Sequence, residues 1–500
     1  MAAKVISCVD LTPTGRNMAK SKNQRAWQLR LIVFINGLIL IFGAALMAIV
    51  AIAFGNASGV FLLASLLSFT LGALLALASH SDFPDLRTQD TFLLTATVWL
   101  TAASFGMLPL YMWHLSFTDA FFESMSAVTT TGSTIMSGLD TTSHDILLWR
   151  GILQWLGGVG FIVTGMALLP MLKVGGMQLF RTESSDQGEK ELKSSTLFAA
   201  ATFWAYLLLT VACMIVYSIG GMNFFDALVH GLTTLSSGGF SNYDSSFGHF
   251  DSSFLQWSAT FFMACAGVPF AWYIRAARKR DFRSEQVRVY LAVVAGSTLL
   301  LTFWLAAFRG FDVMDALRLV AFNVVSAVTT TGYATTDYTT WGGMAAVAFF
   351  LLTASGGCTG STSGGAKMMR WILLARSLKV QISRIRYPHG VFLLKYEGKT
   401  VEDNVLDGVM SFFVFYIFTV GVLAILLNLI GLDFSTAISG ALTSVANVGP
   451  GVGNIIGPAG NFASLPDSAK WVLFFGMYVG RLEMLTVFVL LTRGFWREAV

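Results

Sequence analysis

The sequence has few charged residues for its length. They make up 12% of its 500 residues, whereas hydrophobic residues make up 55% and phenylalanine alone occurs 42 times. An average soluble protein carries roughly 25% charged residues. This shortage of charge excludes an ordinary soluble domain, and we predict an integral, multi-pass membrane protein.

Cysteine and histidine are also scarce, and their spacing indicates no metal centre. The cysteines show no paired spacing, which favours neither a disulfide framework nor a zinc site. They are Cys8, Cys213, Cys265 and Cys358. The six histidines lack the spacing of a motif such as H-E-x-x-H, and no nucleophile constellation is evident. We therefore expect that this chain is not an enzyme and that it holds no organic cofactor.

Long hydrophobic runs supply the expected membrane spans. A helix of about 20 apolar residues crosses a hydrocarbon core of ~30 Å. Runs of this kind lie near 31–53, 59–79, 92–113, 147–172, 197–219, 254–274, 287–308, 341–372, 408–431 and 470–492. The pattern predicts an all-α fold with ten transmembrane helices.

The basic residues are distributed unevenly between alternate loops. If the N-terminus is cytoplasmic, the basic clusters at 20–30, 181–193, 275–283 and 376–399 fall on one side. Four Lys and Arg residues lie outside and two at membrane depth, which leaves 26 of 32 inside. Those outside are Arg150, Arg309, Arg318 and Lys470, and those at membrane depth are Lys367 and Arg481.

The positive-inside rule then places both termini in the cytoplasm, with residues 1–29 as a polar tail. Basic clusters beside spans are usually topology signals, so we expect membrane lipid around this chain and no nucleic acid. A cytosolic protein that docks on these loops stays open as an alternative.

Four short segments share a glycine-centred pattern. They read SAVTTTGS at 126–133, TTLSSGGF at 233–240, SAVTTTGY at 326–333 and TSVANVGP at 443–450. Their glycines are Gly132, Gly239, Gly332 and Gly449, with spacings of 107, 93 and 117 residues. Such spacings suit a repeat that holds two spans and a re-entrant segment, whereas a solenoid repeats every 20 to 50 residues. We predict pore repeats at 90–180, 195–283, 285–385 and 386–500, after an N-terminal transmembrane hairpin at 30–82.

The segment before each glycine is too short to cross a membrane. We expect it to be a half-helix that enters from outside and ends mid-membrane. Its partially negative C-terminus then points at a cation. The expected caps are Thr118 or Asp119, Asp226, Asp312 or Asp315, and Ser435 or Thr436.

Each glycine has a steric reason to follow its half-helix. Glycine cheaply adopts the backbone angles that turn carbonyl groups inward. Non-helical backbone at this depth is tolerated only where it lines a cavity or is buried in protein. Four such turns around one axis predict a cation filter built from backbone carbonyls. The predicted filter residues are Thr130, Thr131, Gly132, Ser237, Gly238, Gly239, Thr330, Thr331, Gly332, Asn447, Val448 and Gly449.

A glycine-rich stretch at 353–366 interrupts one of the spans. Each glycine costs about 1 kcal/mol relative to alanine in a continuous helix, so we predict a broken helix and a mobile loop below the filter. A phosphate-binding loop is disfavoured, because the stretch does not fit G-x-x-x-x-G-K-[ST].

Arg481 lies within the last span, where a charge costs at least about 2.5 kcal/mol on insertion scales. It either pairs with Glu483 or helix-end carbonyls, or projects under the filter as an electrostatic barrier that contacts the glycine-rich loop. We favour the barrier, and we interpret Lys367 as holding the cytoplasmic end of the loop. The predicted gate residues are Gly356, Gly357, Cys358, Thr359, Gly360, Ser361, Thr362, Ser363, Gly364, Gly365, Lys367 and Arg481.

Several of these motifs, taken in order, resemble a known family. The four turns, Trp155-Leu-Gly-Gly-Val-Gly160, the stretch 356–367 and Gly480-Arg-Leu-Glu483 resemble the Trk-type bacterial potassium-uptake proteins of the TrkH/TrkG branch. They resemble the Ktr and HKT transporters more distantly. The resemblance covers nearly the whole chain from about residue 30, including the N-terminal hairpin.

The resemblance implies a pseudo-fourfold pore in the bacterial cytoplasmic membrane, whose filter carbonyls bind potassium above an intramembrane gating loop. It also implies a homodimer and a cytosolic nucleotide-binding regulatory subunit. In that superfamily, a serine at the first filter glycine is associated with sodium transport in some plant members, so Gly132 favours potassium. The fourth turn, Asn447-Val-Gly-Pro-Gly451, diverges from the other three, as it also does in such proteins.

Two alternatives stay open at this point. A gated channel driven by the membrane potential and uptake coupled to protons or sodium both fit the sequence. The chain could also be a membrane sensor or scaffold with a vestigial pore, although glycine at all four turn positions argues against that class.

Overall fold

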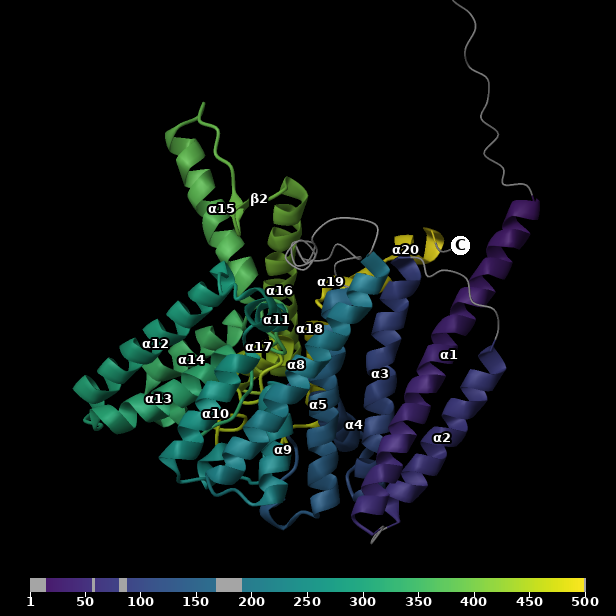
Figure 1. Ribbon diagram of the computed structural model, residues 1–500, viewed down its shortest axis with the longest axis horizontal. Coiled ribbons are helices and arrows are strands. Elements are labelled where there is room, and N and C mark those ends of the chain that lie inside the picture. The colour runs from purple at the N-terminus through teal and green to yellow at the C-terminus, as the bar shows by residue number, and fades with distance from the viewer. Residues whose placement is uncertain (1–14, 56–58, 81–87, 168–190, 499–500) are drawn as a thin grey trace, which may run out of the picture.

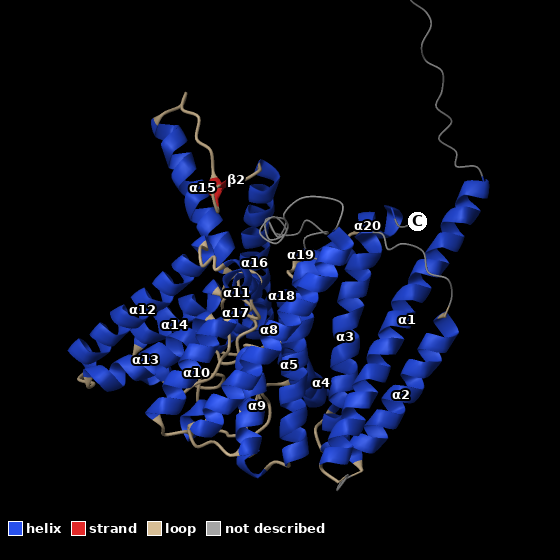
Figure 2. Ribbon diagram, in the orientation of Figure 1, coloured by secondary structure: helices blue, strands red, loops and turns tan. Residues whose placement is uncertain are grey.

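The computed structural model describes residues 15–55, 59–80, 88–167 and 191–498, and most of these residues lie in helices (Figures 1 and 2). The all-helical expectation is therefore confirmed. Cys8 and the basic residues Arg181 and Lys190 lie outside the described residues.

The elements follow one another as helices of two lengths. In the first half of the chain the helices are α1 (Gly15–Ala53), α2 (Val60–Ser79), α3 (Thr88–Trp113), α4 (Phe117–Val128), α5 (His144–Ala167), α8 (Glu191–Ile219), α9 (Phe224–Leu235), α10 (Ser253–Ala266) and α11 (Phe270–Lys279). The second half holds α12 (Glu285–Arg309), α13 (Val313–Val328), α14 (Gly343–Ser355), α15 (Met368–Arg386), α16 (Asp403–Leu429), α17 (Phe434–Ala446), α18 (Asp467–Arg481), α19 (Leu485–Leu491) and α20 (Arg493–Glu498).

Shorter elements connect some of these helices. Three 3₁₀ turns lie at Leu139–Thr141, Ser246–His249 and Tyr338–Trp341. Strands β1 (Lys395–Tyr396) and β2 (Lys399–Thr400) form a small antiparallel hairpin between α15 and α16. Figure 1 shows this hairpin at the end of the molecule where α1 begins and α20 lies, so both described ends of the chain are on one side.

The outer faces of the long helices are apolar. Leu77 on α2, Phe303 on α12 and Ile417 on α16 are each more than two-thirds exposed, an arrangement that suits lipid and not water. Among the described residues, six helices are long and apolar enough to cross a membrane, or eight if each of two bent pairs counts as one span. Two further runs were predicted as spans. The run 147–172 overlaps α5, and the run 341–372 covers α14 and the start of α15.

Two runs predicted as single spans are bent. The run 254–274 divides into α10 and α11, which meet at 89°, and 470–492 divides into α18 and α19, which meet at 112°. Pro269 lies at the first bend, where its ring excludes a continuous helix. At the second bend Glu483 and Met484 have positive φ, and the Glu483 carboxylate is held 2.5 Å from Arg370 on α15.

The N-terminal hairpin of α1 and α2 packs tightly at small residues. A methyl group on Gly37 would approach the Gly72 carbonyl oxygen to 2.8 Å. The hydroxyls of Ser65 and Ser68 donate to the Ala44 and Leu40 carbonyls, each at 2.8 Å. Close backbone approach with interhelical hydrogen bonds is the usual way in which helices associate in lipid.

Candidate functional site

Four half-helices, α4, α9, α13 and α17, each begin with a side-chain cap. Ser116, Asn223 and Asp433 each accept a hydrogen bond from the backbone N–H three residues on, and Asp312 accepts from the N–H groups two and three residues on. Asp312 was predicted correctly. The predictions of Thr118 or Asp119, Asp226, and Ser435 or Thr436 were two or three residues too late, because the cap must be extended backbone that precedes the helix.

The C-terminal ends of the four half-helices share one hydrogen-bonding pattern. In the first, Thr131 N–H donates to the Ser126 carbonyl and Thr130 N–H to the Ala127 carbonyl. The same pairs recur at Gly238–Thr233 and Ser237–Thr234, Thr331–Ser326 and Thr330–Ala327, and Val448–Thr443 and Asn447–Ser444. These are Schellman motifs, which stop a helix at a residue with left-handed backbone.

That left-handed residue is never glycine here. Thr130, Ser237, Thr330 and Asn447 have φ between 54° and 60°. Such a φ is uncommon outside glycine and an outlier for β-branched threonine, so surrounding contacts must hold it. The strain lies at the same place in all four turns, two residues before the glycine.

The four turn glycines form a closed ring, in which each turn contacts the next one along the chain and the fourth contacts the first. A methyl group on Gly132 would overlap the Gly238 carbonyl oxygen, and one on Gly239 would overlap the Thr331 carbonyl oxygen. A methyl group on Gly332 would lie 2.9 Å from the Gly449 backbone nitrogen, and a methyl group on Gly449 would lie 2.9 Å from the Gly132 carbonyl oxygen. No side chain fits at these positions without a shift of the neighbouring backbone.

The glycines differ in conformation. Gly132, Gly239 and Gly332 have φ of 83°, 72° and 83°, values that glycine adopts cheaply. Gly449 is not among the residues with positive φ, so the expectation of a special backbone angle fails at the fourth turn. Its need for glycine comes from crowding, with Pro450 as the following residue.

Side chains bridge the first and fourth turns. Ser133 Oγ donates to the Gly449 carbonyl at 3.0 Å, and Asn447 Nδ2 donates to Thr131 Oγ1 at 3.0 Å and to the Met477 carbonyl at 2.9 Å. The neighbouring Val448 is buried. The divergent fourth turn therefore uses an amide to fasten itself to the first turn and to α18.

Gln154 holds the second turn and was missing from the predicted site. Its Nε2 donates to the Gly238 carbonyl at 2.7 Å, and its Oε1 accepts from Phe240 N–H at 3.1 Å. Gln154 is fully buried on α5. A polar amide inside an apolar run is itself a signal of function in a membrane helix, and it could have indicated this residue.

The glycine-rich stretch lies between α14 and α15, as the broken-helix prediction required. Gly356, Gly360 and Gly365 have φ of 73°, 86° and 70°, and a methyl group on Gly364 would overlap the Ala446 carbonyl oxygen at the end of α17. Cys358, Thr359, Ser361, Ser363 and Lys367 are also buried in this loop. We call residues 356–367 the glycine-rich loop.

The glycine-rich loop is hydrogen-bonded to three of the four turns. Gly364 N–H donates to Thr330 Oγ1 at 2.7 Å, and Gly365 N–H donates to the Ala446 carbonyl at 2.8 Å. Thr362 Oγ1 lies 2.8 Å from Ser237 Oγ and donates to the Leu235 carbonyl at 3.0 Å. The loop is thus fastened directly beneath the glycine ring.

Arg481, at the end of α18, contacts this loop. One guanidinium nitrogen donates to the Thr362 carbonyl at 3.1 Å and the other to the Gly157 carbonyl of α5 at 3.3 Å. Glu483, the partner considered from sequence, forms an ion pair with Arg370. The arginine thereby links α18, α5 and the glycine-rich loop, and it is buried.

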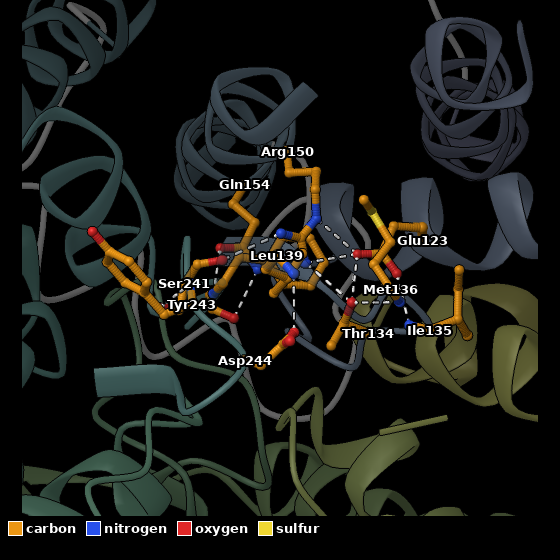
Figure 3. Close-up of polar contacts among 12 residues, drawn as sticks. Glu123, Thr134, Ile135, Met136, Leu139, Arg150, Gln154, Ser241, Tyr243 and Asp244 are labelled. Carbon is orange, nitrogen blue, oxygen red and sulfur yellow. Dashed lines mark hydrogen bonds and ion pairs between the residues drawn. The ribbon is translucent and has the colours of Figure 1, made fainter. Parts of the chain in front are cut away.

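Arg150, which the sequence assigns to the outer side of the membrane, is buried inside the protein. Its side chain is 1% exposed and pairs at 2.8 Å with Glu123, which is 0% exposed. A second guanidinium nitrogen donates to Thr134 Oγ1, and a third to the Ser241 carbonyl (Figure 3). Lys470, also assigned outside, is buried beside Asp119 of α4 at 2.6 Å.

Comparison with known proteins now decides the family. The family model described as TrkH, a cation transport protein, matches residues 57–494. The chain belongs to the TrkH family. The matched residues include all four turns, the glycine-rich loop and Arg481, and the resemblance read from the motifs is confirmed.

Relatives of this TrkH-family chain cover nearly all of it. It is 47% identical to the Trk system potassium uptake protein TrkI of Halomonas elongata, over 90% of this chain and 91% of that one. It is 34% identical to the Trk system potassium uptake protein TrkH of Escherichia coli K12, over 94% of this chain and 99% of that one. The crystal structure of the potassium transporter TrkH from Vibrio parahaemolyticus matches with a TM-score of 0.87 at 32% identity, over 94% of this chain and 100% of that one.

Proposed function

We propose that this chain takes up potassium across the bacterial cytoplasmic membrane through the ring of four turns. The closed ring of glycines carries the proposal, because four matching turns that approach one another so closely can turn their backbone carbonyls toward one axis. Carbonyl oxygens can replace the hydration shell of potassium. The half-helices α4, α9, α13 and α17 end at the ring, so their partially negative ends favour a cation there.

The architecture that goes with this proposal has ten spans and four repeats around one pore. The six long apolar helices, the two bent pairs, α5 and the α14–α15 segment support ten crossings. The recurring Schellman motifs support a fourfold pseudo-symmetry, and the hairpin of α1 and α2 lies outside it. The basic loops support cytoplasmic termini.

The gate is proposed to be the glycine-rich loop together with Arg481. The loop lies under the ring through Thr330 and Ser237, and the guanidinium group adds a positive charge beside it. A buried positive charge opposes the passage of a cation in a low-dielectric site. Motion of the loop away from the ring would open the path, and the membrane potential supplies about 2.3 kcal/mol per charge per 100 mV.

The proposed partners follow from the family. We propose a homodimer in membrane lipid with a cytosolic nucleotide-binding regulatory subunit. The α15 helix and the β1–β2 hairpin extend from one end of the molecule and carry basic residues, which supports a docking role there (Figure 1). A bound regulator at that place could act on the loop, because α15 begins directly after its last residue, Lys367.

One experiment tests the transport proposal directly. The chain is expressed in a bacterial host that lacks potassium uptake, and the purified protein is reconstituted in liposomes for ion-replacement flux. We expect growth at low external potassium and potassium influx that exceeds sodium influx. Absence of both, with the chain present in the membrane and a Trk regulatory subunit supplied, would favour the sensor or scaffold.

A further inference from the structure

A polar side chain recurs at the same register of three half-helices. Nine residues before Gly132, Gly239 and Gly332 stand Glu123, His230 and Asn323, and all three are buried. The same position before Gly449 is Gly440. Burying a polar group costs free energy unless it is hydrogen-bonded, so the partners of these three side chains are informative.

Each of the three side chains binds the irregular segment that follows its own turn glycine, which we call the outgoing strand of that turn. Glu123 accepts from Thr134 Oγ1 and from Ile135 N–H, both at 2.9 Å. His230 Nε2 lies 3.0 Å from Ser241 Oγ. These partners stand two or three residues after the turn glycine.

The third and fourth half-helices bind their strands in a related way. Asn323 Nδ2 donates to Thr335 Oγ1 at 2.9 Å. On the fourth half-helix Ser439, one residue earlier in register, donates to the Val452 carbonyl at 2.8 Å. Each outgoing strand is therefore tied back to its own half-helix by a different chemical group.

The tying side chains are themselves fixed at their other ends. His230 Nδ1 lies 2.9 Å from the Asp226 carbonyl, and Asn323 Nδ2 also donates to the Leu319 carbonyl at 2.8 Å. Both carbonyls are four residues earlier on the same helix. Glu123 is fixed instead by Arg150, whose Nε donates to it at 2.8 Å.

The first and second strands are also joined to each other. Arg150 donates to the Ser241 carbonyl at 3.3 Å, and its guanidinium lies 4.1 Å from the centre of the Phe240 ring. Figure 3 shows Arg150 between Glu123 and Ser241, with Gln154 beside it. A charged pair thus spans two strands, whereas each neutral contact described above holds one.

We propose that Glu123, His230, Asn323 and Ser439 are positioning residues. They hold the four outgoing strands apart, at the filter width that potassium requires. This inference rests on the proposed transport function. None of the four needs to touch the ion. Sodium is smaller than potassium, so the filter carbonyls can coordinate it closely only if the outgoing strands move inward. A strand that is hydrogen-bonded to its own half-helix resists that movement.

The test removes the strand-side hydroxyl and leaves the half-helices intact. Thr335→Val and Ser241→Ala remove the hydroxyls that Asn323 and His230 bind, and Thr335→Ser restores one. Thr419→Val is the matched control, because Thr419 is a buried threonine on α16 that donates only to the Phe415 carbonyl. Each variant is reconstituted, and potassium influx is measured with and without competing sodium.

We expect Thr335→Val and Ser241→Ala to lose preference for potassium over sodium by several-fold. Thr335→Ser and Thr419→Val should keep the wild-type preference, and all four should melt near the wild-type temperature in detergent. Wild-type preference in both Thr335→Val and Ser241→Ala would overturn the positioning role, as would a loss of rate and stability without a change in preference. A wild-type protein that moves no potassium would overturn the transport function instead.

Discussion

Gln154 and Gly238 are joined by a 2.7 Å hydrogen bond, in which the side-chain amide of α5 donates to a carbonyl of the second turn. The other end of the same amide accepts from Phe240 N–H. One side chain therefore fixes the backbone on both sides of Gly239. In the first and third turns a hydroxyl pair forms, Thr129 with Thr131 and Thr329 with Thr331. The second turn has Gly238 at the matching position and cannot form this pair.

Replacing Gln154 with leucine should impair potassium uptake by about tenfold or more. The change leaves a buried carbonyl and a buried N–H without their partner, at a cost of about 1 to 3 kcal/mol each. Uptake into the transport-deficient host measures the effect. Gln256→Leu is the control, since Gln256 is a buried glutamine that donates to the Phe250 carbonyl away from the ring. Equal uptake by the two variants would contradict the role of Gln154.

Replacing Arg481 with alanine should raise potassium or rubidium flux in vesicles several-fold. The variant removes a buried positive charge and both hydrogen bonds that it makes to the Thr362 and Gly157 carbonyls. Arg481→Lys keeps the charge but cannot donate from two nitrogens of one planar group, so its flux should fall between those of the wild type and Arg481→Ala. Flux that stays at the wild-type value in Arg481→Ala would count against the gate.

Thr362→Val should also raise flux, by loosening the glycine-rich loop from the second half-helix. The hydroxyl of Thr362 contacts Ser237 Oγ and the Leu235 carbonyl, and valine keeps the shape without those bonds. Thr359→Val is the matched control in the same loop, because the Thr359 hydroxyl has no hydrogen-bond partner among the described residues. If the two valine variants conduct alike, the hydroxyl of Thr362 does not restrain the loop.

The buried pair of Glu123 and Arg150 predicts a stability pattern. Glu123→Gln alone should destabilise the protein by about 3 to 5 kcal/mol, because it leaves the arginine charge buried without its partner. The double change Glu123→Met with Arg150→Met should recover part of that loss, because it removes the unpaired buried charge but leaves Ile135 N–H without its acceptor. Thermal unfolding in detergent compares the variants. A double variant no more stable than Glu123→Gln would argue against this account.

The positions of the helices and of the four turns were predictable from the sequence, whereas contacts between residues distant in sequence were not. Apolar length located the helices, and the spacing of Gly132, Gly239, Gly332 and Gly449 located the turns. The bends at Pro269 and Glu483 were missed, because an average over 20 residues does not register a local break. The ion pair of Arg150 was not predicted, because its partner Glu123 lies 27 residues earlier, on another helix.

The glycine-rich loop shows the same division. Its composition predicted a break in the helix, and its contacts with Thr330 and Ser237 became visible only when the half-helices were in place. The cap predictions failed by two or three residues at three half-helices, since several nearby polar residues satisfy the same sequence rule.

The hydrogen bond from Ser133 to the Gly449 carbonyl joins residues that are 316 positions apart. During synthesis the first turn leaves the ribosome long before the fourth exists, so the ring has no closing member until α17 has entered the membrane. A chain released before residue 449 therefore lacks the fourth side of the ring, and the Gly132 and Gly332 turns each lack one of their two neighbours.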